Sequence, residues 1–365
     1  MHLITGLNTG GAEMMLYKLS KYKSDKVEYL VVSLTNLGPI SEKIKETGVR
    51  VEALHMKKGP KSIKGLITLF KLIKEFRPNI IQTWLYHADL IGALYGVITR
   101  TPVYWNIRQE KINLKLNKWH TVLTFRLCIL LSFIPKKIIT CSSQAIKFHV
   151  QKGYPKNKFI QIYNGFELEK FTPPNSEQIN NSFGRKLIIH IGRFAPLKNH
   201  KGFIDVANEI LKKAPSTKFE MYGDHVDSKN SQLMEYIQEK GLHKAISLKG
   251  RSDSIHKVYR ESTILISTSF SEGFPNTIGE AMASGTPVLT TRAGDSEMIV
   301  DNKENVFNVR DIEQIADRAS NLLSNFEEYS ANCLEARKQI ESHFDIKVIG
   351  QAYEKEYLSI SSQGK

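Results

Sequence analysis

Two glutamates eight residues apart, Glu272 and Glu280, are the most chemically suggestive feature of this sequence. They belong to the segment SEGFPNTIGEAMASGTP at 271–287, which follows an apolar run and precedes the strand-like run PVLTT. A strand-loop-helix-strand crossover is therefore expected here. The two carboxylates could serve as an acid/base pair, as metal ligands, as acceptors for ligand hydroxyl groups, or as helix-capping groups.

The sequence supports these four uses unequally. Thr277 and Glu280 match the capping box S/T-x-x-E, in which the glutamate satisfies amides of the first helical turn. A metal site lacks partners, because the chain has no D-x-D motif and no histidine nearby at ligand spacing. An acid/base pair needs carboxyl pKa values that the surroundings push apart, which a sequence does not display. Ionised carboxylates accept bidentate hydrogen bonds from hydroxyl groups, and this use is compatible with capping.

A second candidate site lies in the segment HIGRFAPLKNHKGF at 190–203. Arg193 and Lys198 follow a predicted strand and precede a helix that is expected to begin near Asn199. Two cations beside a helix N-terminus can bind a diphosphate. Solvated loop cations are the alternative interpretation.

A glycine-containing turn, TGLNTGGAE, follows the first predicted strand. Gly10 and Gly11 stand where a helix begins, and consecutive glycines let a backbone approach a phosphate closely. A tight strand-helix turn is the alternative. The turn is not G-x-G-x-x-G, and the chain has no Walker-type G-x-x-x-x-G-K-[ST], which argues against dinucleotide and P-loop sites.

The scaffold must bring these loops together. Short β-branched runs alternate with helix-length amphipathic segments, which is typical of βαβ units and parallel sheets. Strands are expected at 2–5, 27–34, 51–56, 79–85, 102–107 and 136–142, and then at 186–193, 219–224, 245–250, 263–269 and 287–291. A stretch rich in Pro, Asn and Ser at 163–186 indicates a domain boundary. We predict an α/β fold with two doubly wound parallel-sheet domains, 1–165 and 166–345, and a C-terminal helix and tail at 346–365.

The positive charge is concentrated in the first of these domains. Residues 1–165 contain 26 Lys and Arg against 9 Asp and Glu, and the rest contain 25 against 28; the balances of +17 and −3 give the net +14. The first half is therefore expected to face an anionic partner, such as nucleic acid, an acidic membrane leaflet or a phosphorylated substrate.

Other sequence features bear on where the protein works. The three scattered cysteines favour a reducing compartment. No signal peptide is predicted, and no run reaches the roughly 18 apolar residues that a spanning helix needs. The most apolar segment, 119–135, is interrupted by Arg126 and closed by Pro135, so we expect a partly buried or membrane-touching helix.

Taken together, these motifs resemble the donor-site signature of family 4 of the retaining nucleotide-sugar glycosyltransferases, the Glu-x7-Glu motif. GLNTGGAE, IGRFAPLKNHKGF and IYNGFE occur where that family has its equivalents. QTWLYHADLIGALYG and VYWNIR resemble a subgroup found in bacterial O-antigen, capsule and lipid-linked glycan assembly. The resemblance covers nearly the whole chain. It implies the GT-B architecture: two Rossmann-like domains facing a cleft, with the C-terminal helix packing back on the N-terminal domain.

The resemblance also implies roles for single residues. Arg193 and Lys198 would bind the donor diphosphate, Glu280 the ribose hydroxyls, and Glu272 the hydroxyls of the transferred sugar. The further donor-binding positions are the backbone of Phe274, Pro275, Asn276 and Thr277, the first-domain glycines Gly10 and Gly11, and Gly250 with Arg251, where the family holds the base.

The chain departs from the family in the segment YWNIRQ. Many members have a histidine there that is credited with contacting the transferred sugar, whereas this chain has Arg108. Arg108 or Asn106 could assume that catalytic-side role, or His87 of YHAD could; a packed or capping histidine is the alternative for His87. The first strand is expected to be short, because only MHLIT precedes the glycine turn.

The expected function is transfer of a sugar from a nucleotide diphosphate sugar, UDP by family frequency, to a hydroxyl of a lipid-linked saccharide. Retention of configuration is expected, in bacterial surface polysaccharide synthesis. The resemblance implies that no metal or other cofactor is needed, in which case Arg193, Lys198 and helix amides would meet the charge that develops on the leaving diphosphate. The basic half would rest on the anionic inner leaflet of the cytoplasmic membrane and hold an isoprenoid diphosphate acceptor, with 119–135 as a contact.

Three alternatives are weighed against this function. A GT-B epimerase or phosphorylase shares the fold, but the Glu-x7-Glu pair and GRFAPLKN argue against both. A nucleic-acid-binding protein would suit the charge, but the chain has no recognisable basic-aromatic module, so no nucleic-acid partner is expected. An inactive scaffold on the same fold is disfavoured by the intact Arg193, Lys198, Glu272 and Glu280.

Overall fold

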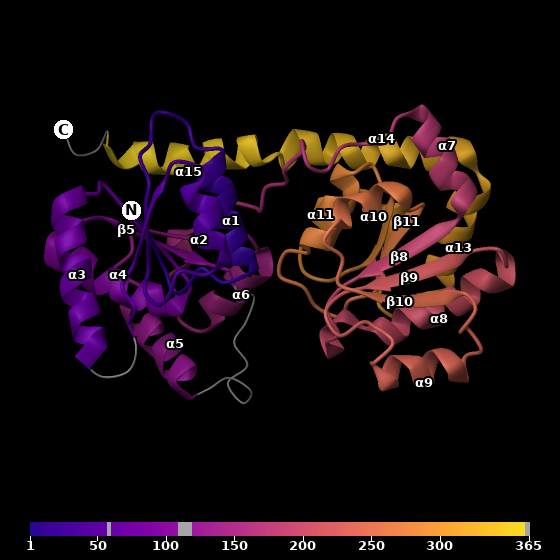
Figure 1. Cartoon of the computed structure of the whole chain (residues 1–365), viewed down its shortest axis with the longest axis horizontal. Coiled ribbons are helices and arrows are strands. Elements are labelled where there is room, and N and C mark those ends of the chain that lie inside the picture. The colour runs from indigo at the N-terminus through magenta and orange to yellow at the C-terminus, as the bar shows by residue number, and fades with distance from the viewer. Residues whose placement is uncertain (57–59, 109–118, 362–365) are drawn as a thin grey trace. The chain divides into compact units, whose positions relative to one another are not determined.

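The protein is described by a computed structural model that covers residues 1–56, 60–108 and 119–361. The chain divides into two compact units (Figure 1). Unit 1 comprises Met1–Gly165 together with Ile346–Lys365, and unit 2 comprises Phe166–Asp345. The tail expected after residue 361 lies outside the described residues.

Unit 1 is built on a parallel sheet of seven strands in the order β3-β2-β1-β4-β5-β6-β7. The strands are β1 (His2–Ile4), β2 (Leu30–Ser33), β3 (Arg50–Ala53), β4 (Ile81–Trp84), β5 (Val103–Ile107), β6 (Lys137–Thr140) and β7 (Phe159–Gln161). The helices are α1 (Gly11–Lys21), α2 (Pro39–Lys45), α3 (Pro60–Phe76), α4 (Tyr86–Thr99), α5 (Trp119–Leu131), α6 (Ser143–Gln151), the 3₁₀ turn η1 (Lys156–Lys158) and α15 (Ile346–Ser361).

Each face of this sheet has its own core. On one face, buried side chains of α3, α4 and α5 pack against the strands, for example Leu69, Ala93 and Phe125. On the other face, α1, α2 and α15 contribute buried residues such as Leu16 and Ile44. Figure 1 shows this division, with α3, α4 and α5 on one side of the sheet and α1 and α15 on the other. Strands buried on both faces explain why their sequences read as continuous apolar runs.

Helix α15 belongs to unit 1 although it follows unit 2 in the chain. Tyr353 and Tyr357 are buried in the core shared with α1 and α2. The predicted packing of the C-terminal helix on the N-terminal domain is thereby confirmed.

Unit 2 contains a parallel sheet of six strands in the order β10-β9-β8-β11-β12-β13, which is the doubly wound order. The strands are β8 (Leu187–Ile191), β9 (Lys218–Tyr222), β10 (Ile246–Gly250), β11 (Ile264–Ser267), β12 (Val288–Thr291) and β13 (Val306–Phe307). The helices are α7 (Ser176–Arg185), α8 (His200–Lys213), α9 (Ser231–Glu239), α10 (Ile255–Glu261), α11 (Asn276–Ala283), α12 (Ser296–Val300), α13 (Ile312–Ser324) and α14 (Phe326–His343), with 3₁₀ turns η2 (Pro196–Lys198) and η3 (Lys303–Asn305).

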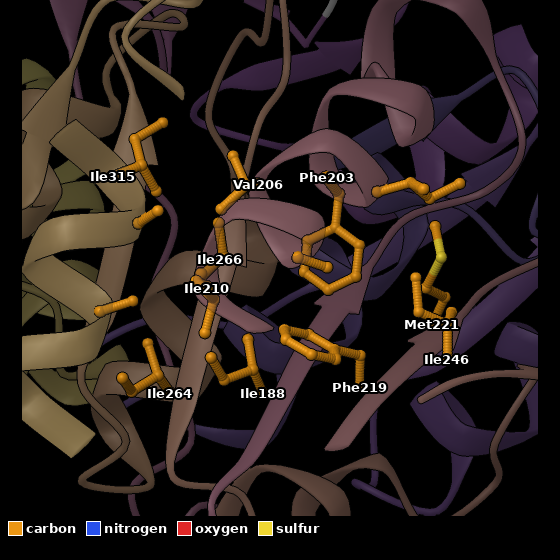
Figure 2. Packing of buried hydrophobic residues seen from close by; sticks show 14 of the residues in the cluster. Ile188, Phe203, Val206, Ile210, Phe219, Met221, Ile246, Ile264, Ile266 and Ile315 are labelled. Carbon is orange, nitrogen blue, oxygen red and sulfur yellow. The ribbon is translucent and has the colours of Figure 1, made fainter. Parts of the chain in front are cut away.

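The core of unit 2 lies between its sheet and helices α8, α9 and α13. Figure 2 shows Phe203, Val206 and Ile210 of α8 among strand side chains such as Ile188 and Ile266. These residues are almost fully buried. Full burial of a large apolar side chain stabilises by roughly 1.5–3 kcal/mol, so this core fixes the strand ends that carry the candidate site.

The predicted fold class, two doubly wound parallel sheets, is confirmed. The eleven predicted strands all form, and β1 is short as expected. The sequence analysis missed β7 and β13, which are edge strands of three and two residues. Runs this short do not show the period-two pattern on which strand prediction depends. Within the described ranges, no helix combines the length and hydrophobicity that crossing a bilayer requires.

Candidate functional site

Three of the predicted donor-site residues of unit 2 lie on loops at the point where its strand order reverses. Strands β8 and β11 are neighbours there, with Ile188 paired to Ile264. The loop after β8 carries Arg193 and Lys198, and the loop after β11 carries Glu272. In open α/β sheets, ligands bind beside the carboxyl ends of strands at this switch point.

Lys198 and Glu272 form a direct ion pair across the two loops. The Lys198 Nζ lies 2.5 Å from Glu272 Oε1, and the hydroxyl of Ser269 donates to the same oxygen at 2.7 Å. The two charged side chains are only 20% and 13% exposed. The pair is therefore partly desolvated, so its mutual attraction is less screened by solvent and salt than that of an exposed surface pair.

Backbone and amide contacts hold the two loops together beside this ion pair. The Asn199 side chain caps α8 by accepting from Gly202 N, and its Nδ2 donates to Thr268 O at 3.0 Å. The Thr268 hydroxyl donates back to Asn199 O at 2.9 Å. Phe270 N donates to Leu197 O at 2.8 Å. Leu197, Lys198 and Asn199 of the β8 loop are thereby held in a fixed register against the β11 loop.

Arg193 lies at the start of the β8 loop, and its side chain is exposed to solvent. No ion pair or side-chain hydrogen bond to its guanidinium occurs in the described part of the chain. The loop passes close to the end of β9, because a Cβ on Gly223 would lie 2.1 Å from Gly192 O. Glycine at 223, with φ of 149°, is therefore required for the strand-end loops to pack.

Gly250 and Arg251, the predicted base-binding positions, end β10 on the same side of the sheet as the loops after β8 and β9. Gly250 is buried with φ of 70°, and its N–H and C=O bond to Val226 O and Gly223 N. Arg251 is exposed. The backbone conformation at position 250 favours glycine and so explains Gly250 structurally. The exposed side chain of Arg251 has no such structural explanation.

Helix α11 presents its N-terminus beside Glu272. It begins at Asn276 with Pro275 as N-cap, and Asn276 and Thr277 form its first turn. Phe274 is buried and stacks on Phe166 with ring centroids 6.2 Å apart, so mainly its backbone is available to a ligand. A helix N-terminus favours an anion.

The capping-box interpretation of Glu280 is wrong. Thr277 lies inside α11 rather than at its N-cap, and Pro275 makes no side-chain cap hydrogen bond. Glu280 is therefore in the second turn, beyond the reach of that motif. Instead its Oε2 accepts a hydrogen bond of 3.0 Å from the hydroxyl of the buried Tyr259 of α10. Tyr259 holds this carboxylate in one orientation.

Gly294 packs against the backbone of the loop that carries Glu272. It has φ of 62°, and a Cβ there would lie 1.9 Å from Glu272 O. Asp295 N donates to Gly273 O at 3.3 Å. Close backbone packing, together with the ion pair, fixes the position of Glu272.

The glycine turn of unit 1 opens α1 at the carboxyl end of β1. Gly10 is the N-cap of α1 in extended backbone, and the Glu13 carboxylate lies against it, since a Cβ on Gly10 would be 2.3 Å from Glu13 Oε2. Gly11 has no atom within 4 Å of its Cβ position. Packing therefore does not explain the glycine at 11, which leaves the backbone open at a helix N-terminus.

His87 lies in the first turn of α4, directly after β4. Its side chain is half-buried, and its ring centroid is 6.1 Å from that of His120 in α5. Burial and the nearby His120 lower the pKa of His87 below its ordinary value, so the imidazole is neutral at neutral pH and able to accept a proton. The backbone before it is strained, because Leu85 has φ of 72°.

Asn106 and Arg108, at the end of β5, are held from within unit 1. Asn106 Nδ2 donates to the Tyr353 hydroxyl at 3.3 Å. Arg108 donates to the same hydroxyl at 2.7 Å and to Asn164 Oδ1 at 2.6 Å, and its guanidinium stacks over Trp84 at 5.0 Å. The arginine that replaces the expected histidine thus ties β5 to α15.

The structure brings together some predicted residues and adds others. Within unit 2 it joins Lys198 directly to Glu272, with Arg193 on the same loop as Lys198 and Glu280 in the second turn of α11. Sequence analysis missed Ser269 and Tyr259, which position the two glutamates, and Tyr353, which binds Arg108. No local pattern marks these three residues. In the described part of the chain, no three His, Cys, Asp or Glu side chains gather as a metal site.

Comparison with known families assigns both halves of the chain. Residues 9–170 match the model described as Glycosyltransferase Family 4, and residues 185–325 match that described as Glycosyl transferases group 1. The chain is a glycosyltransferase by these two matches, and its two Rossmann-like units have the GT-B fold. The two matches cover the two Rossmann-like units in turn, including the loops that carry Lys198 and Glu272.

Several characterised relatives are similar to this GT-B chain. Poly(ribitol-phosphate) alpha-N-acetylglucosaminyltransferase of Staphylococcus aureus is 31% identical over 46% of the chain but only 35% of the relative's own length. UDP-Gal:alpha-D-GlcNAc-diphosphoundecaprenol alpha-1,3-galactosyltransferase of Escherichia coli is 24% identical over 67% of the chain and 65% of its own. Capsular polysaccharide biosynthesis glycosyltransferase CapM of Staphylococcus aureus is 24% identical over 83% of each.

Solved structures agree on the fold. The Anabaena protein HepE, crystallised in complex with UDP, superposes with a TM-score of 0.82 at 19% identity, covering 98% of this chain and 99% of HepE. At this identity the likeness establishes the architecture of the GT-B chain.

Proposed function

We propose that this GT-B chain transfers a sugar from a nucleotide diphosphate sugar to a hydroxyl group of a lipid-linked saccharide, with retention of configuration. The observation that carries the proposal is the Lys198–Glu272 ion pair at the switch point of unit 2. Beside it lie an exposed arginine, a second carboxylate and a helix N-terminus. Cations and helix amides suit a diphosphate, and carboxylates suit sugar hydroxyl groups.

In this proposal each charge has a distinct task. Arg193 and Lys198 bind the diphosphate and stabilise the charge that develops on it as it leaves, with the amides of Phe274 to Thr277. Glu272 accepts hydrogen bonds from the transferred sugar. Glu280 accepts them from the ribose. The turn at Gly250 and Arg251 receives the base, and no metal ion is required.

The acceptor side of the proposal rests on unit 1. The neutral His87 and the turn at Gly10 and Gly11 lie at the carboxyl ends of β4 and β1, where an α/β sheet presents its loops. A lipid-linked acceptor is supported by the name of the Escherichia coli relative, which includes diphosphoundecaprenol. A role in surface polysaccharide synthesis, at the cytoplasmic face of the membrane, is supported by the capsular relative. A UDP donor is supported by the UDP complex of HepE.

Nucleotide binding by the purified protein tests the donor half of this proposal. We expect UDP to raise the melting temperature more than GDP, ADP or TDP, because a ligand at a hundredfold excess over its Kd stabilises by about 2.7 kcal/mol. Glu280→Gln keeps an acceptor for Tyr259 but loses the charge, and should weaken UDP binding about tenfold, or about 1.4 kcal/mol.

The matched control is Glu239→Gln, an exposed glutamate at the end of α9. It should leave UDP affinity unchanged. If no nucleotide shifted the melting temperature, or if Glu280→Gln and Glu239→Gln bound UDP equally well, the proposed donor site would be wrong.

A further inference from the structure

The outward face of α4 is apolar where an ordinary surface helix is polar. Leu94, Val97 and Ile98 are 52%, 60% and 55% exposed. The opposite face of the helix, with Ala93 and Tyr95, is already buried against the sheet and α3. Packing within unit 1 therefore does not account for the second apolar face.

Helix α5 repeats this arrangement. Phe125 and Cys128 are buried in the unit 1 core. Its other side exposes Trp119 at 73% and Leu130 at 69%, and Phe133 just beyond the helix is 67% exposed. A helix with large apolar side chains on its outward side as well as its buried side is expected in a protein interior or in contact with lipid.

Helix α3 adds a third apolar stripe. Ile63, Ile67 and Phe70 are all exposed, and their spacing places them on one side of the helix. The buried side of α3 is formed by other residues, among them Leu69 and Ile73.

The three stripes belong to one continuous layer. Tyr95 of α4 donates to Leu66 O of α3 at 2.7 Å, and Cys128 of α5 donates to Tyr86 O of α4 at 3.4 Å. Figure 1 shows the three helices on the same side of the sheet of unit 1. We call the outward sides of α3, α4 and α5 the outer helical face. In unit 2, by contrast, exposed apolar residues such as Met234 and Leu334 lie on different helices, which is normal for a soluble surface.

Cations accompany the apolar residues of the outer helical face. Lys64, Lys71 and Lys74 of α3 and Arg126 of α5 are exposed. In the described residues of these helices the only acids are Glu75, which pairs with Arg50, and Asp89, which is fully buried. The face is therefore apolar and positively charged together.

We propose that the outer helical face docks on the anionic surface of a phospholipid bilayer. Apolar side chains would enter the interface between headgroups and acyl chains, and the lysines and Arg126 would bind anionic headgroups. A second copy of the same face is a poor partner, because its cations would oppose these cations. The inference rests on the proposed function, in which the acceptor is anchored in a membrane.

Vesicle binding by the full chain tests the surface directly. We expect the protein to co-sediment with vesicles of phosphatidylcholine containing phosphatidylglycerol, to bind pure phosphatidylcholine vesicles less, and to release partly at high salt. No nucleotide or acceptor is present, so the outcome is independent of donor binding, which the UDP melting shift reports separately. If the protein co-sedimented with neither type of vesicle at low salt, the proposal would be overturned.

Tryptophan emission reports on the same contact. The chain has three tryptophans, and Trp84 and Trp105 are fully buried, so a blue shift on adding anionic vesicles would come from Trp119. We expect that shift. Binding without a change in emission would place the contact elsewhere on the molecule and contradict the proposal.

Paired variants distinguish vesicle binding by the outer helical face from non-specific binding by other apolar surface residues. Trp119→Ser with Leu130→Ser should weaken vesicle partitioning by about tenfold or more, since each removes a large apolar side chain from the interface. Lys71→Glu with Lys74→Glu should abolish the preference for anionic lipid. The matched control, Met234→Ser with Leu334→Ser in unit 2, should bind as the wild type.

The UDP melting shift and circular dichroism verify that each variant is folded. If the variants of α3 and α5 bound vesicles like the control, the proposal would fail. If instead they converted a dimer into a monomer in sedimentation velocity without affecting vesicle binding, the face would be a self-association surface.

Discussion

At the scale of single side chains, the charges of the proposed donor site are positioned before a ligand arrives. Glu272 is held both by Lys198 and by the Ser269 hydroxyl. In the proposed donor complex, where Lys198 would turn towards a diphosphate, the hydrogen bond from Ser269 would keep the carboxylate in place. Preorganised dipoles and charges of this kind cost no reorganisation at the moment of reaction.

Glu280 depends in the same way on Tyr259, which leads to a prediction. Tyr259→Phe preserves the buried ring but removes the hydroxyl that donates to Glu280 Oε2. We expect UDP affinity to fall about three- to tenfold and unfolding free energy to fall by about 1 kcal/mol, the usual contribution of such a hydrogen bond. Calorimetric titration with UDP measures the first effect.

Two comparisons show whether Tyr259 acts through Glu280. Tyr236→Phe removes an equivalent bond, a hydroxyl donating to Asp205 at 2.8 Å, and should lower stability without changing UDP affinity. In a double-mutant cycle, Tyr259→Phe should add little to the affinity loss of Glu280→Gln. Additive losses would mean that Tyr259 has a merely structural role.

At the scale of elements, the sequence predicts the strands and the loops that follow them better than the contacts between those loops. Apolar runs identify β8 and β11, and the topology of a parallel sheet then places Lys198 near Glu272. Tyr259 is 21 residues from Glu280 in the chain, so only the packing of α10 against α11 brings them together. The two-residue edge strand β13 is too short to show a period of two in the sequence. It is stabilised by its pairing with β12, which a local pattern does not reveal.

The start of α11 illustrates a competing local signal. Thr277-x-x-Glu280 satisfies the capping-box pattern, yet the helix begins two residues earlier, with Pro275 rather than Thr277 as its N-cap. Proline fixes its own φ near the value of a helix start and has no N–H to satisfy. The tight packing of Glu272 O on Gly294 also fixes where the loop ends. Neither constraint appears in a four-residue motif.

Helix α6 provides a pH-dependent prediction, because it buries His149. Nε2 lies 2.7 Å from the Tyr86 hydroxyl and Nδ1 lies 2.7 Å from Ala145 O. Burial lowers the pKa of His149 to about 4. The unfolded chain, with an ordinary histidine pKa, then binds more protons than the folded chain between about pH 4 and 6.5, so stability falls as pH falls through this window.

Between pH 7 and pH 5.5 this histidine alone should cost about 1 kcal/mol of unfolding free energy. His149→Gln removes the titration while keeping a donor and an acceptor. We therefore expect the melting temperature of His149→Gln to fall less than that of the wild type over this interval. Buried His190, whose pKa is lowered to about 3, should leave a residual dependence in both proteins. Identical changes in the two proteins would contradict the assignment.

At the scale of the whole molecule, unit 1 is discontinuous in sequence. Ile346, Ile349, Tyr353 and Tyr357 of α15 are buried in its core. Truncation after Asp345 should remove roughly 1.5–3 kcal/mol per side chain, which approaches the 5–15 kcal/mol that stabilises a typical domain. We expect unit 1 to unfold or become protease-sensitive, while unit 2 retains its UDP-dependent melting shift.

Removal of residues 362–365 alone is the control, and it should change neither the protease resistance of unit 1 nor the melting of unit 2. Limited proteolysis with mass spectrometry identifies which unit is cut. A truncated protein in which unit 1 resists proteolysis like the full chain would show that α15 is dispensable.

The same discontinuity has a consequence for biosynthesis. A ribosome adds about 5–20 residues per second, so about 10–40 s separate the completion of β7 from the emergence of α15. During that interval the first unit lacks Tyr353, the residue that receives Asn106 and Arg108. Unit 2, which is continuous, can complete its fold first. Unit 1 therefore completes its fold only after unit 2 has been synthesised, although most of its residues leave the ribosome first, and its core lacks the α15 residues throughout that interval.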